Sequence, residues 1–150
     1  MLRQYIDSVI VSRRIDNLNI YINLTKVYDF SMLPIENRLK KKSAFNATYK
    51  TGKIIRQDGI TLFCGKKKTN DYPTKIGFVV SKKIHKRAVK RNRIKRLMRE
   101  SIRLLIKENN FSCDSMSLIF VASQKQLNKN FYEVDSSIKK LVSKLWLMES

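Results

Sequence analysis

Apolar side chains recur between residues 86 and 108 with the period of an amphipathic helix. At 100° per residue they form one stripe, while most of the lysines and arginines of the segment fall on the opposite side. Two asparagines at positions 109 and 110 follow and can end the helix. We therefore expect a helix over residues 86–108 with one face packed on a core. The stripe consists of Ile94, Leu97, Met98, Ile102, Leu105 and Ile106.

Two other segments have helical spacing. Phe45 and Tyr49 lie one turn apart, after Ser43, which can cap a helix, and before Gly52, which can end one. Near the C-terminus, Asn130 and the glutamate three residues later have the spacing of a capping box. The apolar residues that follow predict a last helix; they are Val134, Ile138, Leu141, Val142 and Leu145.

Strand patterns occupy the segments between these helices. Residues 53–57 and 60–65 flank Asp58-Gly59, a dipeptide that favours a two-residue hairpin turn. Residues 75–81 predict a third strand, and the continuous apolar run of residues 117–122 is typical of a buried one. The order helix, three strands, helix, strand, helix predicts an α+β sandwich, with helices on one side of a four-stranded sheet.

Residues 1–31 differ from the rest of the chain in charge. They contain four basic and three acidic side chains, so nearly all the excess positive charge follows Met32. Short strand-like runs at residues 20–22 and 26–28 could add an edge hairpin. We expect instead a poorly ordered extension or an artefact of start-codon choice, with residues 32–150 forming the single domain. A chain begun at Met32 should then fold and function.

The excess of basic over acidic residues limits the kinds of partner that the protein can bind. The formal net charge is +20, and between Lys82 and Arg103 eleven side chains are basic and only Glu100 is acidic. A solvated helix face usually mixes both signs, because pairs of opposite charge one turn apart stabilise it. A basic face with almost no acids predicts a polyanionic partner, and nucleic acid is the leading candidate.

Other classes of partner and site are disfavoured. No apolar run is long enough to span a membrane, and a basic membrane-surface protein would need an anchor rich in Trp and Phe, whereas the single Trp146 lies near the C-terminus. Cys64 and Cys113 are far apart and form no CxxC motif, so the sequence indicates neither a disulfide framework nor a zinc site. We expect a protein of the reducing cytoplasm with no membrane partner.

A compact motif lies within the basic helix. It reads Arg91-Asn92-Arg93-x-Lys95-Arg96-x-x-Arg99-Glu100, after Ser81-Lys82-Lys83 and before Ser101-x-Arg103. This motif resembles that of the bacterial ribonuclease P protein subunit. Leu33-Pro34-x-Glu36-Asn37-Arg38-Leu39 is similar to the opening of that family, and Phe45-x-x-x-Tyr49-x-x-Gly52 to its first helix. The resemblance covers residues 33 to about 147.

The resemblance implies both a fold and a function. The fold is one shared with a ribosomal-protein domain, and its strand–helix–strand crossover is left-handed, against the general rule. The function is that of the RNA-binding subunit of ribonuclease P, which binds the catalytic RNA and the single-stranded 5′ leader of precursor tRNA and assists removal of the leader. The RNA subunit and its bound Mg²⁺ perform the hydrolysis in this family, and no protein partner is implied.

The resemblance also implies which residues contact RNA. Arg91 has an alternative role in packing at the helix start, because its angle falls nearer the apolar stripe. Ser123 stands where an arginine is common in the family, which puts one basic contact in doubt. The implied RNA-binding residues are Lys82, Lys83, Arg91, Asn92, Arg93, Lys95, Arg96, Arg99 and Arg103.

A group of aromatic residues forms a second candidate site. Alternation along residues 60–65 places Phe63 on the face opposite Ile60 and Leu62, where Phe45 and Tyr49 from the first helix could approach it. A small satellite core under a short helix is the ordinary explanation. By the resemblance, however, Phe45, Tyr49 and Phe63 line the leader-binding cleft, where bases can stack on aromatic rings.

Groups for autonomous nuclease chemistry are missing from the sequence pattern. Clustered carboxylates for Mg²⁺ or a pair of histidines would be needed, but the acids are scattered and His85 is the only histidine, set among lysines. We therefore expect no catalytic residue and no metal site in the protein itself. The alternative function is that of a structural RNA-binding protein of the ribosomal type with no role in cleavage.

Overall fold

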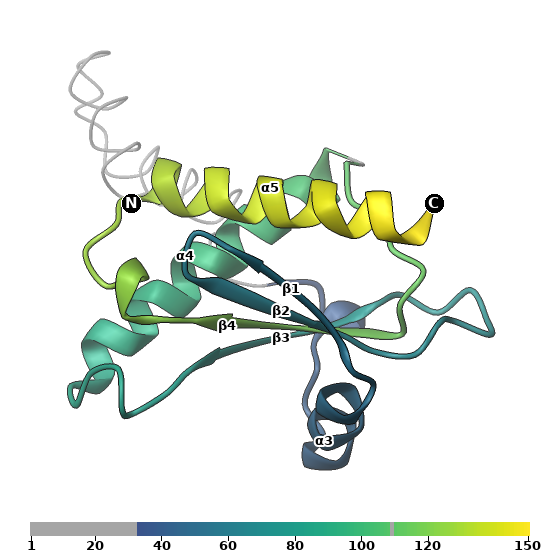
Figure 1. Ribbon diagram of the computed structural model, residues 1–150, viewed down its shortest axis with the longest axis horizontal. Helices are drawn as coiled ribbons and strands as arrows, with labels where there is room; N and C mark the ends of the chain where they lie inside the picture. The colour runs from purple at the N-terminus through teal and green to yellow at the C-terminus, as the bar shows by residue number, and fades with distance from the viewer. Residues whose placement is uncertain (1–32, 109) are drawn as a thin grey trace, which may run out of the picture. The chain divides into compact units, whose positions relative to one another are not determined.

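The computed structural model describes residues 33–108 and 110–150, so the expectations for residues 1–31 lie outside the described part of the chain. The predicted order of helices and strands is confirmed (Figure 1). The elements in chain order are the 3-10 turn η1 (Ile35–Asn37), α3 (Lys42–Lys50), β1 (Lys53–Gln57), β2 (Ile60–Cys64), β3 (Lys75–Val80), α4 (Ala88–Lys107), β4 (Ser117–Ala122), the 3-10 turn η2 (Gln124–Gln126) and α5 (Phe131–Glu149).

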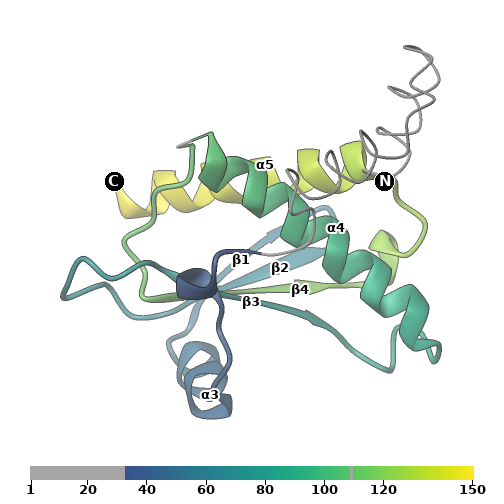
Figure 2. The same ribbon diagram turned by 180° about the vertical axis from the view of Figure 1, so that it is seen from behind.

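The four strands form one mixed sheet in the order β1-β2-β4-β3. β2 pairs antiparallel with both β1 and β4, whereas β3 and β4 are parallel and are joined through α4. Figures 1 and 2 show α4 and α5 together on one face of the sheet and α3 near one end of the other face. The predicted α+β sandwich with a four-stranded sheet is therefore confirmed, but the expectation of helices on one side only is wrong for α3, which packs on the face opposite α4 and α5.

The main core lies between the sheet and the two long helices. The register places Ile55, Leu62, Phe120 and Phe78 in one row across the four strands. Phe120 is fully buried and its ring stacks on that of Phe78, with 5.7 Å between the centroids. Burying each such side chain contributes roughly 1.5 to 3 kcal/mol. The helices supply, among others, Ile94, Met98, Ile102, Val134, Ile138 and Leu141, all at 0% exposure.

The predicted turn and cap of the longer elements are present. Asp58 and Gly59 have φ angles of 49° and 83°, the left-handed values that a tight hairpin turn requires. Asn130 accepts a hydrogen bond from the backbone N–H of Glu133, whose carboxylate accepts one from the N–H of Asn130. Both features depend on residues close in sequence, which is why the pattern predicted them.

One predicted helix cap is wrong. α3 begins at Lys42 after an extended Lys41, so Ser43 lies inside the first turn and caps nothing; the helix has no side-chain cap. α4 begins at Ala88, after an extended Arg87, which agrees with the predicted start at about residue 86. The predicted end of α3 is confirmed, since Gly52 follows it with a φ of 81°.

Candidate nucleic-acid interface

α4 separates its apolar and basic residues as the spacing predicts. Ile94 and Met98 face the core at 0% exposure, and Leu97 is buried beside them. The side chains of Asn92, Arg93 and Arg96 are exposed, while those of Lys95 and Arg99 are half-buried. We call the surface formed by Asn92, Arg93, Lys95, Arg96 and Arg99 the α4 face.

The turn before α4 brings more cations to the same end of the helix. Lys82 and Lys83 are exposed, and the turn is held by a hydrogen bond from the N–H of Lys83 to the Ser81 hydroxyl, with 3.2 Å between the atoms. His85 accepts a hydrogen bond at Nδ1 from the N–H of Arg87, at 3.1 Å. The histidine therefore has a structural partner within this turn.

Two residues of the motif use their guanidinium groups to fix the start of α4. Arg91 donates to the carbonyl oxygens of His85 and Lys86, at 2.7 and 2.6 Å, which supports the alternative of packing at the helix start. Arg93 donates to the carbonyl oxygen of Lys129, at 3.0 Å, and so links α4 to the loop before α5. Arg93 remains exposed, so it can meet a phosphate as well.

Arg103 is paired with the one acidic residue of the helix. Its guanidinium makes two hydrogen bonds to the Glu100 carboxylate, at 2.9 and 2.7 Å, and Glu100 is only 7% exposed. The spacing of three residues allows this pairing, but the sequence reasoning did not predict it. Arg103 therefore brings a largely compensated charge to the helix, in contrast with Arg96 and Arg99.

Arg99 lies at the boundary between α4 and the sheet. Its guanidinium carbon is 5.8 Å from the centroid of the Phe78 ring, a favourable cation–π geometry. The pKa of Arg99 is lowered, first by partial burial and then by the positive charges of Arg38 and Arg96. Like charges thus accumulate here instead of being neutralised.

Arg38 is a basic residue near this site that the sequence reasoning did not select. It is half-buried, and its Nε donates to the carbonyl oxygen of Leu33, at 2.7 Å. The residue forms an isolated bridge with Ile76 at the edge of β3. Its position in the opening stretch resembling the family was noted, but only the fold shows that it lies beside α4.

On the opposite face of the sheet, α3 carries Phe45 and Tyr49 and contacts β2, the strand that carries Phe63. The rings of Tyr49 and Phe63 meet edge to face, with 4.8 Å between centroids. Phe45 packs on Gly77, where an added Cβ would lie 2.7 Å from the ring. The side chains of Phe45 and Phe63 are half-buried, and that of Tyr49 is 38% exposed. We call the partly exposed surface formed by Phe45, Tyr49 and Phe63 the α3 cleft, after the cleft predicted from the sequence; its role in leader binding stays a prediction.

Hydrogen bonds hold α3 in place beside the cleft. The hydroxyl groups of Thr48 and Ser117 are 2.6 Å apart, and Thr51 donates to the carbonyl oxygen of Cys64. Beneath the helix, Ile119 is fully buried. These bonds join α3 to the sheet and so fix the position of the aromatic residues that it carries.

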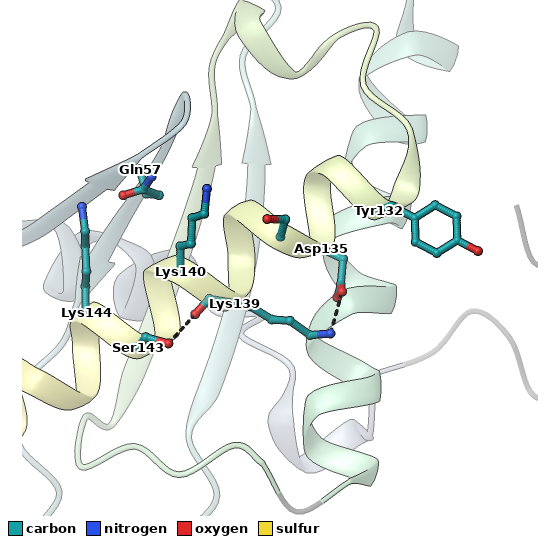
Figure 3. A pocket seen from close by; sticks show the side chains of 8 residues that line it. Gln57, Tyr132, Asp135, Lys139, Lys140, Ser143 and Lys144 are labelled. Carbon is teal, nitrogen blue, oxygen red and sulfur yellow. Dashed lines mark hydrogen bonds and ion pairs between the residues drawn. The ribbon is translucent and has the colours of Figure 1, made fainter.

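α5 carries a second row of cations on its outward side. They border an open groove of about 630 Å³ between the helix and the end of β1. Lys139 pairs with Asp135 at 2.7 Å and Lys140 with Asp58 at 3.5 Å, while Lys144 Nζ donates to the carbonyl oxygen of Arg56 at 3.4 Å. Figure 3 shows Lys140 and Lys144 extending toward the strand that carries Gln57. We call the surface with Lys139, Lys140 and Lys144 the α5 face.

The two cysteines, Cys64 and Cys113, are buried and free. Burial raises the pKa of Cys64 to about 12 and that of Cys113 to about 11, so both thiols stay protonated at neutral pH. In the described ranges, no three His, Cys, Asp or Glu side chains converge, and this donor set does not fit a resident Mg²⁺. None of the described helices has the length and apolar character needed to cross a membrane.

Comparison with known proteins shows which family this chain resembles. The ribonuclease P family model matches residues 33–146. The ribonuclease P protein component of Clostridium kluyveri is 36% identical over 114 residues, which cover 73% of this chain and 95% of that protein. Its counterpart from Clostridioides difficile is 37% identical over 106 residues, covering 71% and 89%.

Solved structures agree with the family match. The RNase P protein of Staphylococcus aureus superposes with a TM-score of 0.60 at 26% identity, over 72% of this chain and 94% of that one. The RNase P protein of Thermotoga maritima has a TM-score of 0.59 over 71% of this chain and 96% of that one. At 22% identity, the second likeness concerns the fold alone.

Proposed function

The chain belongs to the ribonuclease P protein family and acts as the protein subunit of ribonuclease P in tRNA processing, and we propose that it does so through two separate RNA-binding surfaces. The α4 face binds the catalytic RNA, and the α3 cleft binds the single-stranded 5′ leader of precursor tRNA. The observation that carries this proposal is the concentration of cations on α4 that have no carboxylate partner among the described residues.

On the α4 face, phosphate binding follows from elementary electrostatics. Each Lys or Arg that meets a phosphate releases counterions, so affinity falls with a log–log salt slope of roughly 0.7 to 0.9 per contact. Arginine adds two parallel hydrogen bonds in a fixed plane, which lysine lacks. The residues proposed to contact RNA here are Lys82, Lys83, Asn92, Arg93, Lys95, Arg96 and Arg99, with Arg91 and Arg103 chiefly positioning the helix.

In the α3 cleft, the binding energy comes from stacking. A single-stranded leader presents unstacked bases, and each base that stacks on an aromatic ring gains roughly 1 to 3 kcal/mol. Phe63 and Tyr49 already meet edge to face, so one ring can offer its face to a base while the other supports it. Because stacking needs no base-specific hydrogen bond, this surface suits leaders of many sequences.

Hydrolysis is assigned to the RNA subunit and its bound Mg²⁺. The side chains of the described protein residues offer no convergent set of oxygen donors, and His85 is engaged in the turn before α4. The protein's own contribution is to bind, orient and neutralise: it positions the leader and offsets phosphate repulsion where substrate meets catalytic RNA. We place the protein in the cytoplasm with these RNA partners.

The cleft assignment is tested by Phe63→Ala, with binding of leader-bearing and leaderless tRNA to the assembled complex measured beside a thermal melt. We expect the leader-bearing substrate to lose about 1 to 3 kcal/mol and the leaderless tRNA to be nearly unaffected. A residue of the core would behave differently, with a stability loss of roughly 3 to 5 kcal/mol and equal damage to both RNAs. That second pattern would refute the leader cleft.

A further inference from the structure

Directly after η1, Arg38 forms an isolated parallel bridge with Ile76 at the edge of β3. The N–H of Leu39 donates to the carbonyl oxygen of Ile76 at 3.0 Å, and the Asn37 side-chain amide donates to that of Thr74 at 3.1 Å. With the bridge between Arg38 and Ile76, these bonds fix the backbone on both sides of Arg38. The position of Arg38 is therefore set by the sheet and not by a mobile loop.

This register determines where the Arg38 side chain points. Paired residues on neighbouring strands project to the same face of a sheet, and alternate residues of one strand share a face. Ile76 faces the core under α4, so Arg38 points to the α4 side, whereas Leu39 points to the other. The position of Leu39 agrees, since its Cδ2 lies 3.2 Å from where a Cβ on Gly77 would be.

Arg38 thereby becomes a neighbour of two arginines from α4. Phe78 is two residues beyond Ile76 on the same face, and Arg99 lies over its ring. Arg96 precedes Arg99 by three residues and so occupies the adjacent position along the helix. Both Arg38 and Arg96 act on the charge of Arg99 strongly enough to lower its pKa, after the larger effect of burial.

No acidic side chain balances this group in the described part of the chain. The ion pairs found there involve other residues, and the nearest acid along α4, Glu100, is committed to Arg103. Arg38 uses its Nε to bind the carbonyl oxygen of Leu33, which leaves its two terminal nitrogens available. Arg38 and Arg96 each add positive charge beside Arg99, and like charges held together without an acid are unfavourable unless an anion joins them.

We propose that Arg38, Arg96 and Arg99 form a phosphate-binding site at the edge of β3, with Arg38 supplied from outside the basic helix. The ligand class is a phosphate group of an RNA backbone, and in this respect the site rests on the proposed function. Planar guanidinium groups bind phosphate oxygens in pairs, so three of them from two elements fix both the position and the direction of the bound strand. Arg38 is thus a specific phosphate ligand and not a structural strap alone.

Inorganic pyrophosphate provides a probe that needs no RNA. It is titrated at constant ionic strength into the full chain, Arg38→Gln and Lys144→Gln, and binding is followed by the arginine Nε–H resonances and by thermal melts. We expect Arg38→Gln to bind pyrophosphate about tenfold more weakly and Lys144→Gln to match the wild type. Without pyrophosphate, Arg38→Gln should melt no lower than the wild type, because like-charge repulsion is relieved.

A purely structural Arg38 gives the opposite result. Arg38→Gln would then melt lower at every pyrophosphate concentration and bind the probe as the wild type does, which would overturn the proposal. Arg96→Gln keeps the bond from Arg38 to Leu33 intact, so it separates the two roles: the proposal requires this variant also to lose about tenfold in pyrophosphate affinity. Unchanged affinity in Arg96→Gln would equally overturn it.

A second arm identifies the source of the phosphate. In binding to ribonuclease P RNA, Arg38→Gln should lower the salt slope by roughly 0.7 to 0.9, the value of one contact. Loss of pyrophosphate binding with an unchanged slope would overturn the assignment to RNA and indicate a site for free phosphate. These results are independent of cleavage, so failure of this site and failure of the proposed function are distinguishable.

Discussion

The α4 face and the α5 face are both rows of cations on the outward side of a long helix, yet they differ in what surrounds each charge. On α5, Lys139 and Lys140 pair with Asp135 and Asp58. On α4, the one acidic residue, Glu100, pairs with Arg103, one turn beyond the α4 face. The two helices differ both in the number of basic residues, eight on α4 and three on α5, and in the acids beside them, since α5 carries three acidic residues and α4 only Glu100.

The two faces differ in how much electrostatic energy a bound phosphate can gain. An exposed ion pair is worth about 0 to 1 kcal/mol, so the α5 face is already close to its lowest electrostatic energy in water. A phosphate that approached it would meet carboxylates as well as ammonium groups. The α4 face keeps like charges together, and an RNA backbone relieves their repulsion on binding. We therefore interpret α5 as a solvated helix face and α4 as the interface.

The largest effect should come from removing Arg96 and Arg99, two arginines of the α4 face that have no carboxylate partner among the described residues. Arg96→Ala with Arg99→Ala is expected to weaken binding to ribonuclease P RNA by about 100-fold, since two charged hydrogen-bonding groups contribute roughly 3 kcal/mol together. The salt slope should fall by roughly 1.4 to 1.8. Filter binding over a salt series measures both quantities.

Lys140→Ala with Lys144→Ala is the matched control for that experiment, because it removes the same number of charges from the α5 face. We expect less than about a twofold change in affinity and an unchanged slope, since these ammonium groups are assigned no phosphate contact. Equal losses from the two double variants would show that net charge, and not its arrangement, governs binding.

A smaller effect is expected when α4 is made to resemble α5. Lys95→Glu places a carboxylate one turn before Arg99, where it can form the kind of pair that occupies α5. Relative to Lys95→Gln, which only removes the charge, this change should cost about a further tenfold in RNA affinity with little change in the circular dichroism spectrum. Identical affinities for the two variants would mean that pairing on α4 does not matter.

The smallest effect is expected from the converse change, in which α5 loses its acids. Asp58→Asn with Asp135→Asn frees two lysines, while both new side chains can still accept the hydrogen bonds made there. Asparagine also tolerates the positive φ of position 58. We predict at most about a threefold gain in RNA affinity, because ammonium groups on this face lack the planar, partly buried setting of Arg99. A gain of a hundredfold in a titration would refute this distinction.

Local signals explain how much of the fold was predictable. The hairpin at Asp58 and the capping box at Asn130 depend on residues within three positions of each other, so the pattern contains all the necessary information. The apolar stripe of α4 is equally local. Ser43 was misassigned because a residue type that favours caps does not by itself fix the first residue of a helix. The extended backbone of Lys41 shows that the helix begins one residue before Ser43.

The site was predictable in composition but not in its partners. The motif on α4 selected Arg96 and Arg99 as candidates, yet the proximity of Arg38 depends on a strand bridge across 38 residues of sequence, between positions 38 and 76. Arg91 binds backbone carbonyls, which no side-chain pattern reveals. The pair between Glu100 and Arg103 was visible in the spacing, but a count of charges passed over it.

Cleavage of precursor tRNA by a bacterial ribonuclease P RNA at low Mg²⁺, with and without this protein, tests the central claim most directly. The account predicts that the protein alone cleaves nothing, that it stimulates cleavage by the RNA, and that Arg96→Ala with Arg99→Ala loses most of this stimulation. A folded protein that binds RNA but gives no stimulation would contradict the account and favour a structural RNA-binding role. Cleavage by the protein alone would contradict the assignment of hydrolysis to the RNA.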